Sequence, residues 1–197
     1  DLHIQHEYRV RNGGHEFSYW REALPNALHF ISDCFEGKVY RGDVSQNTIK
    51  SKSPKIPIYE NYRYDIALPP GYIDASRFYP VVYIFGDFTS NRKQEFAGLA
   101  QKGMLDGTLP FMLLVFLKEN ETNLVDSIIP QLESHYGARM GYRFRALIGF
   151  EEGGVAALKN ALVPETFTSC VLFDAPITTD LLKEAITANK TAFKRTW

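Results

Sequence analysis

Residues 143–158 decide the fold, and they read RFRALIGFEEGGVAAL. The short apolar run from Ala146 to Ile148 predicts a buried strand, and the small residues from Gly153 onward predict a helix. Between them lies a Gly-x-x-x-Gly turn, where glycine removes the Cβ atoms that a tight turn and a close helix–strand contact exclude. The stretch therefore predicts a strand, a sharp turn and a helix, with Glu151 at the centre of the turn.

Apolar runs of strand length alternate with stretches of helical spacing from about residue 80 onward. Such alternation predicts a mostly parallel sheet with helices on both faces, which is a three-layer α/β fold. A further strand is predicted at 62–68, just before Pro69. The predicted strands of the alternating region are 81–85, 111–117, 146–148 and 169–173, and its predicted helices are 94–103, 122–136, 153–162 and 180 to about 194.

The first part of the chain has a different pattern. Residues 3–10 alternate loosely and predict a strand, which Asn12-Gly13-Gly14 ends. Apolar residues at helical spacing over 17–31 predict a helix that tolerates Pro25 near its first turn or at a kink, and Glu36-Gly37 closes it. From 38 to 55 the composition changes to Gly, Ser, Thr, Lys and Asn, which is typical of a connector leading into edge strands.

The composition excludes two classes of function. The chain has 197 residues, enough for one substantial core, and its 45% hydrophobic content is that of an ordinary globular protein. A formal net charge of −1 without a basic stripe predicts no nucleic-acid partner. The longest apolar run, Phe111 to Leu117, is far shorter than the ~20 residues that span a bilayer, so no membrane span is expected.

Cysteine and histidine spacing predicts neither a metal site nor a cofactor. Cys34 and Cys170 form no metal pattern and no disulfide framework, and we expect both to be small buried apolar residues. His3, His6 and His29 have no shared metal-ligand spacing. The sequence begins without a signal-peptide pattern, so we expect a cytosolic or an already processed protein, and the compartment stays open.

Four segments together resemble one branch of the α/β-hydrolases, the esterases that include enterochelin, feruloyl and acetyl-xylan esterases and S-formylglutathione hydrolase. The match covers most of the chain, and the combination is specific where no single motif would be. The resemblance implies a three-layer α/β-hydrolase fold, incomplete or rearranged in this chain, and a serine esterase ancestry. The segments are Tyr64–Tyr72 (YDIALPPGY), Tyr79–Gly86 (YPVVYIFG), Gly149–Gly154 (GFEEGG) followed by Pro164–Phe167 (PETF), and Gly13–Trp20 (GGHEFSYW).

The order of these segments departs from the family. The histidine-bearing segment Gly13–Trp20 belongs near the end of such a domain, yet here it opens the chain, and one further sheet strand is missing. Two explanations stay open. In the first, residues 1–36 are the tail of one esterase domain and 38–197 the start of a second, in a tandem protein; the connector composition favours this one. In the second, the chain is permuted, and residues 1–36 pack beside their own 38–197.

The resemblance implies a role for each motif position. Glu151 stands where the nucleophilic serine of Gly-x-Ser-x-Gly belongs, and His15 matches the general base. Backbone donors for an oxyanion are expected at Gly86, Asp87 and Glu152, although an acidic Asp87 opposes a developing anion. The competing interpretations are that Glu151 and Glu152 only complement a helix N-terminus and that His15 is structural, beside Trp20.

Two further residue sets are weighed as catalytic candidates. Asp174 follows a predicted strand like a triad acid, but by family position it is one strand too early. Ser134 and His135 are adjacent, and we expect neighbours on a helix to point apart and form no nucleophile–base pair.

Two functions remain as hypotheses. The first is an esterase-like domain without its serine, with a structural, regulatory or ligand-binding role beside an active second esterase domain or subunit. The second is an active ester hydrolase that uses His15 with a serine from a companion domain, or unusual chemistry at Glu151. In both, the resemblance implies acyl esters of sugars, phenolics or siderophores, or a carbohydrate, as the small-molecule ligand.

Overall fold

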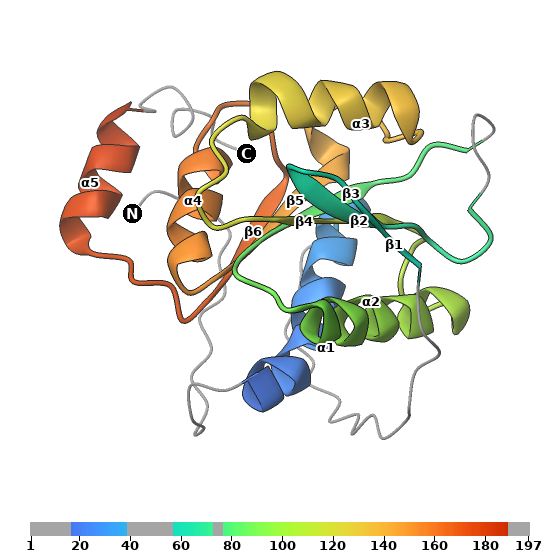
Figure 1. Ribbon diagram of the computed structural model, residues 1–197. Coiled ribbons are helices and arrows are strands. Elements are labelled where there is room, and N and C mark those ends of the chain that lie inside the picture. Colours follow the sequence, from blue (N-terminus) through green and yellow to red (C-terminus); the bar gives the residue numbers. More distant parts are fainter. Residues whose placement is uncertain (1–16, 39–56, 73–76, 189–197) are drawn as a thin grey trace.

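The computed structural model describes residues 17–38, 57–72 and 77–188, which form a six-stranded sheet covered by helices on both faces (Figure 1). The order of the strands across the sheet is β1-β2-β4-β3-β5-β6. The strands are β1 (Ile58–Glu60), β2 (Tyr64–Ala67), β3 (Val81–Phe85), β4 (Leu113–Leu117), β5 (Arg145–Phe150) and β6 (Ser169–Phe173). The helices are α1 (Phe17–Phe35), α2 (Ser90–Leu105), α3 (Ile129–His135), α4 (Glu152–Ala161) and α5 (Thr179–Ala188).

The sheet confirms the predicted mostly parallel α/β architecture. β4, β3, β5 and β6 are parallel to one another, while β1 and β2 form an antiparallel pair and β2 joins β4 in antiparallel fashion. Every residue of β3 and β4 is buried, as expected for parallel strands that are covered on both faces. The continuous apolar runs in the sequence follow from that double burial.

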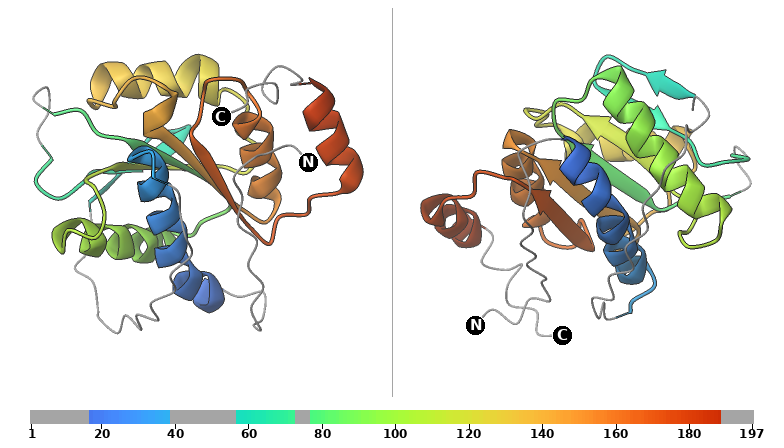
Figure 2. Two further views of the ribbon diagram at one scale, coloured as in Figure 1. Left: turned by 180° about the vertical axis from the view of Figure 1, so that it is seen from behind. Right: turned by 90° about the horizontal axis from the view of Figure 1, so that it is seen from below.

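Two hydrophobic layers lie on opposite faces of the sheet. α1 and α2 cover one face, and α3 and α4 cover the other, as the two views of Figure 2 show. Alternate strand residues enter alternate layers: Val82 and Ile84 of β3 pack toward α1 and α2, whereas Tyr83 and Phe85 pack toward α3 and α4. This period of two is the geometry of a pleated strand.

Most of the predicted helix and strand boundaries lie close to the observed ones, and two of the differences have local causes. α2 begins at Ser90, earlier than predicted, because the hydroxyl oxygen of Thr89 accepts a hydrogen bond from the Arg92 N–H and caps the helix. The single helix predicted for 122–136 is instead a π-helical turn, Leu124–Ile128, followed by α3. Pro130 stands in the first turn of α3, where its missing N–H costs no helical hydrogen bond.

α1 packs on the sheet of its own chain. Trp20, Leu24, Leu28 and Ile31 are all buried, and they belong to the same core as residues of β3 and β5. The helix continues through Pro25, which is half-buried. The division of the chain near residue 37 into parts of two tandem domains stays a prediction.

Several predictions fall outside the described residues. These are the strand at 3–10, His15 with its glycines, most of the 38–55 connector and the last part of the final helix. Within the described part of the chain, no helix has the length and apolar character needed to cross a membrane.

Candidate functional site

The turn between β5 and α4 is sharp, as the sequence predicts, and its backbone is strained. Glu151 connects the two elements with φ 50° and ψ −129°, on the positive-φ side that residues with a Cβ rarely adopt. Its N–H donates to the Phe173 carbonyl at 2.9 Å, and its carbonyl accepts from the Gly154 N–H at 2.9 Å. Such strain persists only where surrounding contacts hold it, and it concentrates at functional sites.

Three glycines allow α4 to approach the sheet. A Cβ on Gly149 would lie 2.5 Å from the Gly154 Cα, and one on Gly153 would lie 2.6 Å from the Phe85 carbonyl carbon. A Cβ on Gly154 would lie 2.3 Å from the Ala175 Cβ. These separations are far inside van der Waals contact, so the close strand–helix contact predicted from the glycines is confirmed.

The loop after β3 lies beside this turn. Phe85 is fully buried at the position where the resembled family has histidine, and Gly86 follows it. The Gly86 N–H donates to the Leu117 carbonyl at 3.1 Å, so this donor is already engaged. Asp87 is exposed. Three backbone N–H groups were expected to bind an oxyanion, and those of Asp87 and Glu152 remain as candidates. Glu152 is the first residue of α4, and the first N–H groups of a helix have no acceptor within the helix.

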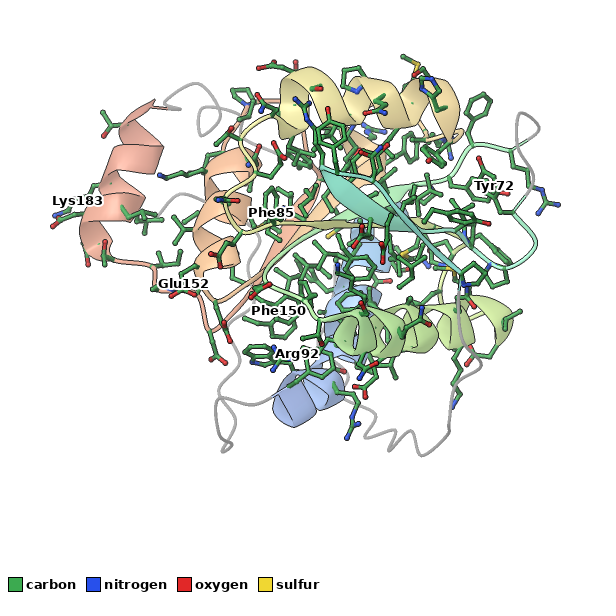
Figure 3. All side chains as sticks on the ribbon, in the orientation of Figure 1. Tyr72, Phe85, Arg92, Phe150, Glu152 and Lys183 are labelled. Atoms are coloured by element: carbon green, nitrogen blue, oxygen red, sulfur yellow. The ribbon has the colours of Figure 1, made fainter. Side chains whose placement is uncertain are left out.

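An aromatic cluster lies under the turn on the α1 and α2 face. Phe150, the residue before Glu151, stacks on Phe173 with ring centroids 4.7 Å apart. It also contacts the rings of Trp20 and Phe88, each with centroids 5.2 Å away. Figure 3 labels Phe150 and Glu152 at this edge of the sheet. Because four aromatic rings surround the strand end, the backbone of Glu151 has little freedom to relax.

Asp174 lies at the same edge and binds α1. It follows β6 with φ 49°, and its carboxylate oxygen accepts a hydrogen bond from the Trp20 Nε1–H at 2.7 Å. Sequence reasoning weighed Asp174 as a triad acid and missed this partner. The sequence shows an acidic residue after a predicted strand and a tryptophan in the Gly13–Trp20 segment. These two residues are 154 positions apart, and no local sequence rule connects residues at that separation.

The expectation that Ser134 and His135 point apart is wrong. The Ser134 Oγ lies 2.7 Å from the His135 Nδ1, because both side chains fold back at the last turn of α3. The Ser134 hydroxyl donates to the Gln131 carbonyl at 3.0 Å, and the His135 Nδ1 lies 3.0 Å from the same oxygen. This exposed arrangement ends a helix, where both side chains lie against the same backbone carbonyl.

The two cysteines are free, and burial raises the pKa of each thiol. The pKa of Cys170 rises to about 12, although the residue as a whole is only half-buried. For Cys34, the nearby Ser169 hydroxyl lowers the pKa in part without reaching full hydrogen-bond geometry. The described residues hold no group of three or more His, Cys, Asp and Glu side chains able to bind a metal ion.

A small cavity of about 120 Å³ opens next to the Gly86–Asp87 loop. It lies where β2, the ends of β3 and β4 and the first turn of α2 meet. Lys93 forms an ion pair with Asp65 in its wall, and Arg63 donates from Nη1 to the Ser127 Oγ at 2.6 Å. Its lining includes aromatic, cationic and acidic side chains: Tyr62, Tyr64, Phe88, Phe116, Arg63, Lys93, Lys118, Asp65 and Asp87.

Solved structures with a similar fold include esterases. A ferulic acid esterase superposes with a TM-score of 0.54 at 16% identity, over 66% of this chain and 63% of that chain. A protein from Capnocytophaga ochracea superposes with a TM-score of 0.50 at 15% identity, over 68% of this chain and 44% of that one. A ferulic acid esterase from the anaerobic fungus Anaeromyces mucronatus matches at 17% identity, over 75% and 82% of the two chains, with a TM-score of 0.48.

The superposition on the first ferulic acid esterase supports the class of fold. No protein-family model and no curated protein sequence matches the chain. The chain spans about 63% of the length of the first ferulic acid esterase. The sheet, the helices on both faces and the superposition together give this chain the α/β-hydrolase-like fold of esterases.

Proposed function

We propose that this chain is an esterase-fold domain that does not hydrolyse esters through its own nucleophile and instead serves as a structural, regulatory or ligand-binding partner of an active esterase domain. The observation that carries the proposal is Glu151, held at φ 50° in the tight turn between β5 and α4. A serine hydrolase needs a hydroxyl at this point, with an imidazole to take its proton.

A carboxylate at Glu151 opposes ester hydrolysis in two ways. It is a weak nucleophile toward esters, and its negative charge lies at the N-terminus of α4, which would otherwise stabilise an oxyanion. In a triad protease, removal of the nucleophile alone costs on the order of a millionfold in rate. The charged side chain therefore blocks the position and also competes for the positive end of the helix.

The loop after β3 supports the same conclusion. The Gly86 N–H is engaged with the Leu117 carbonyl, and the neighbouring Asp87 adds a second negative charge near the turn. The adjoining cavity of about 120 Å³ is somewhat smaller than an engineered cavity of about 150 Å³ that binds benzene, so it has room for about one ring. It suits part of a small ligand, such as one group of a phenolic or sugar ester, better than a whole substrate.

The alternative is an active carboxylic-ester hydrolase in which His15 acts with a serine of a companion domain. Its support is the position of α1, because Trp20 contacts Phe150 and Asp174 at the edge of the sheet that carries the turn between β5 and α4. His15, two positions before Phe17 in the sequence, is the residue that would serve as the general base in this function.

The experiment that tests the proposal is hydrolysis of p-nitrophenyl acetate by the purified chain, with and without a fluorophosphonate probe; the alternative needs the same assay in the presence of the companion domain. We expect no turnover above the buffer rate and no labelling. Turnover with labelling would replace the proposal with a serine hydrolase, and mapping of the labelled peptide would name its nucleophile. Turnover without labelling, abolished in Glu151→Gln, would assign the chemistry to Glu151 and equally overturn the proposal.

A further inference from the structure

Two short segments lie side by side just before β3 and before β5. The Tyr79 N–H donates to the Gly137 carbonyl at 2.9 Å, and the Arg139 N–H donates to the Tyr79 carbonyl at 2.8 Å. These bonds form an isolated parallel bridge between Tyr79 and Ala138, which are both buried. The exposed residues beside the bridge are Arg77, Phe78, Arg139 and Met140. The bridge therefore presents side chains of both segments to solvent next to each other.

The surface around this bridge combines arginine, aromatic and methionine side chains. Phe78 is 67% exposed and Met140 is 72% exposed, although both are large and apolar. Residues 137–145 contain three arginines and no aspartate or glutamate. Protein interfaces are enriched in arginine, methionine and aromatic residues and depleted of lysine, glutamate and aspartate, so this composition matches an interface. We call it the Arg–aromatic surface, and its residues are Arg77, Phe78, Arg139, Met140, Tyr142, Arg143 and Phe144.

The positive charges of this surface are not neutralised within the described part of the chain. No described carboxylate forms an ion pair with Arg77, Arg139 or Arg143, whereas Arg145 pairs with Glu133. The Arg139 guanidinium lies over the Phe144 ring, 3.7 Å from its centroid. Such stacking orients a guanidinium but keeps its charge and its N–H donors, which match a carboxylate in two parallel hydrogen bonds. The surface therefore offers several oriented cations to an anionic partner.

The Arg–aromatic surface lies away from the turn that carries Glu151. It precedes β3 and β5, so it is at the amino end of the parallel strands, whereas Glu151 follows β5 at their carboxyl end. Tyr72, whose ring centroid lies 5.5 Å from that of Tyr79, is labelled in Figure 3 on the opposite side of the molecule from Glu152. A partner bound at the amino end would leave the turn open.

We propose that the Arg–aromatic surface docks an acidic segment of a partner protein in which carboxylates alternate with apolar side chains. The carboxylates pair with the guanidinium groups, and the apolar side chains cover Phe78 and Met140. Exposed apolar side chains between the arginines favour a protein over a nucleic acid, and the formal net charge of −1 gives no long-range attraction to a polyanion. The inference does not rest on the proposed function, because it concerns a different end of the sheet.

Fluorescence anisotropy with the purified chain tests the proposal. The probe is a labelled short peptide of alternating glutamate and leucine, and a lysine–leucine peptide is its control. We expect saturable binding of the acidic peptide that weakens with added salt. Binding should be at least tenfold weaker in Arg139→Glu, at least about fivefold weaker in Phe78→Ser, and within about twofold of wild type in Lys183→Glu. Lys183 is exposed on α5, far from Tyr72 in Figure 3, and its substitution makes the same change in charge as Arg139→Glu.

A second variant, Arg143→Glu, keeps the test independent of the stacking of Arg139 on Phe144. Within the described residues Arg143 contacts only Tyr142, so its substitution should leave the fold intact and again weaken peptide binding about tenfold. No saturable binding, equal binding of the lysine–leucine peptide, or equal losses in Arg139→Glu and Lys183→Glu would each overturn the proposal. Tighter binding of a single-stranded oligonucleotide or of phosphatidylserine vesicles, lost in Arg139→Glu, would assign the surface to a nucleic acid or a membrane and equally overturn it.

Discussion

The indole Nε1–H of Trp20 donates to the carboxylate of Asp174 at 2.7 Å and ties α1 to the end of β6. Trp20 is 3% exposed, whereas Asp174 is exposed, so the bond links the buried core to the rim of the candidate site. Through this contact, a helix from the start of the chain lies beside a turn formed about 130 residues later. Substitutions that remove this hydrogen bond therefore test the placement of α1 against β6.

A double-mutant cycle with Trp20→Phe and Asp174→Gly measures that bond. Glycine is chosen because Asp174 has φ 49°, which glycine adopts without strain. We expect a coupling free energy of about 0.5–1 kcal/mol from urea unfolding, reduced by the exposure of the carboxylate. Additive effects of the two substitutions would show that the bond contributes nothing in solution.

Glu151→Ser alone should not produce an active esterase. The serine would enter the turn, but the Gly86 N–H stays engaged and Asp87 keeps its charge near the site. We expect p-nitrophenyl acetate hydrolysis within about tenfold of wild type, which is small beside the millionfold effect of a working nucleophile. Glu152→Ser, with the same charge change at an exposed neighbour, is the matched control. A rate increase of about a thousandfold confined to Glu151→Ser would contradict the prediction.

Gly153→Ala should severely destabilise the fold. The new Cβ would meet the carbonyl carbon of Phe85 at 2.6 Å and its oxygen at 2.7 Å, and both are backbone atoms of a central strand that cannot move aside. We expect a loss of about 3 kcal/mol or more in the free energy of unfolding, the upper range for overpacking. Lys159→Ala, on the exposed side of α4, should change stability by less than about 0.5 kcal/mol. Similar unfolding midpoints for the two variants would contradict the close contact.

Stability should fall at alkaline pH partly through Cys170. Its pKa rises from 9.0 to about 12 on folding, so between these values the unfolded chain loses the thiol proton while the folded chain keeps it. The contribution of the protonated Cys170 thiol to the free energy of unfolding is fully present below pH 9 and is lost as the pH rises toward 12. Between pH 8 and pH 10 the wild type should lose about 1 kcal/mol of unfolding free energy relative to Cys170→Ala. Parallel stability–pH curves for wild type and variant would show that the thiol ionises equally in both states.

Local patterns were sufficient for most of the elements. β6 spans the predicted residues 169–173, and the strand, turn and helix around Glu151 follow from the glycines and the apolar run. The structure has a π-helical turn and a separate helix α3 where one helix was predicted over 122–136, because Pro130 favours the first turn of a new helix. The Ser134–His135 contact was missed because both side chains turn back to the Gln131 carbonyl, a local side chain–backbone pattern that the rule for neighbouring helix positions does not include.

The alternating α/β architecture and the sharp turn with an acidic residue at its centre follow from the amino-acid sequence alone, because burial on both faces and close backbone contacts restrict residue type position by position. Only the tertiary structure decided that β4 lies between β2 and β3, that α1 packs on its own sheet and that Trp20 binds Asp174. These relationships join residues far apart in the chain. They depend on which surfaces bury the most apolar area together, and no local period encodes that choice.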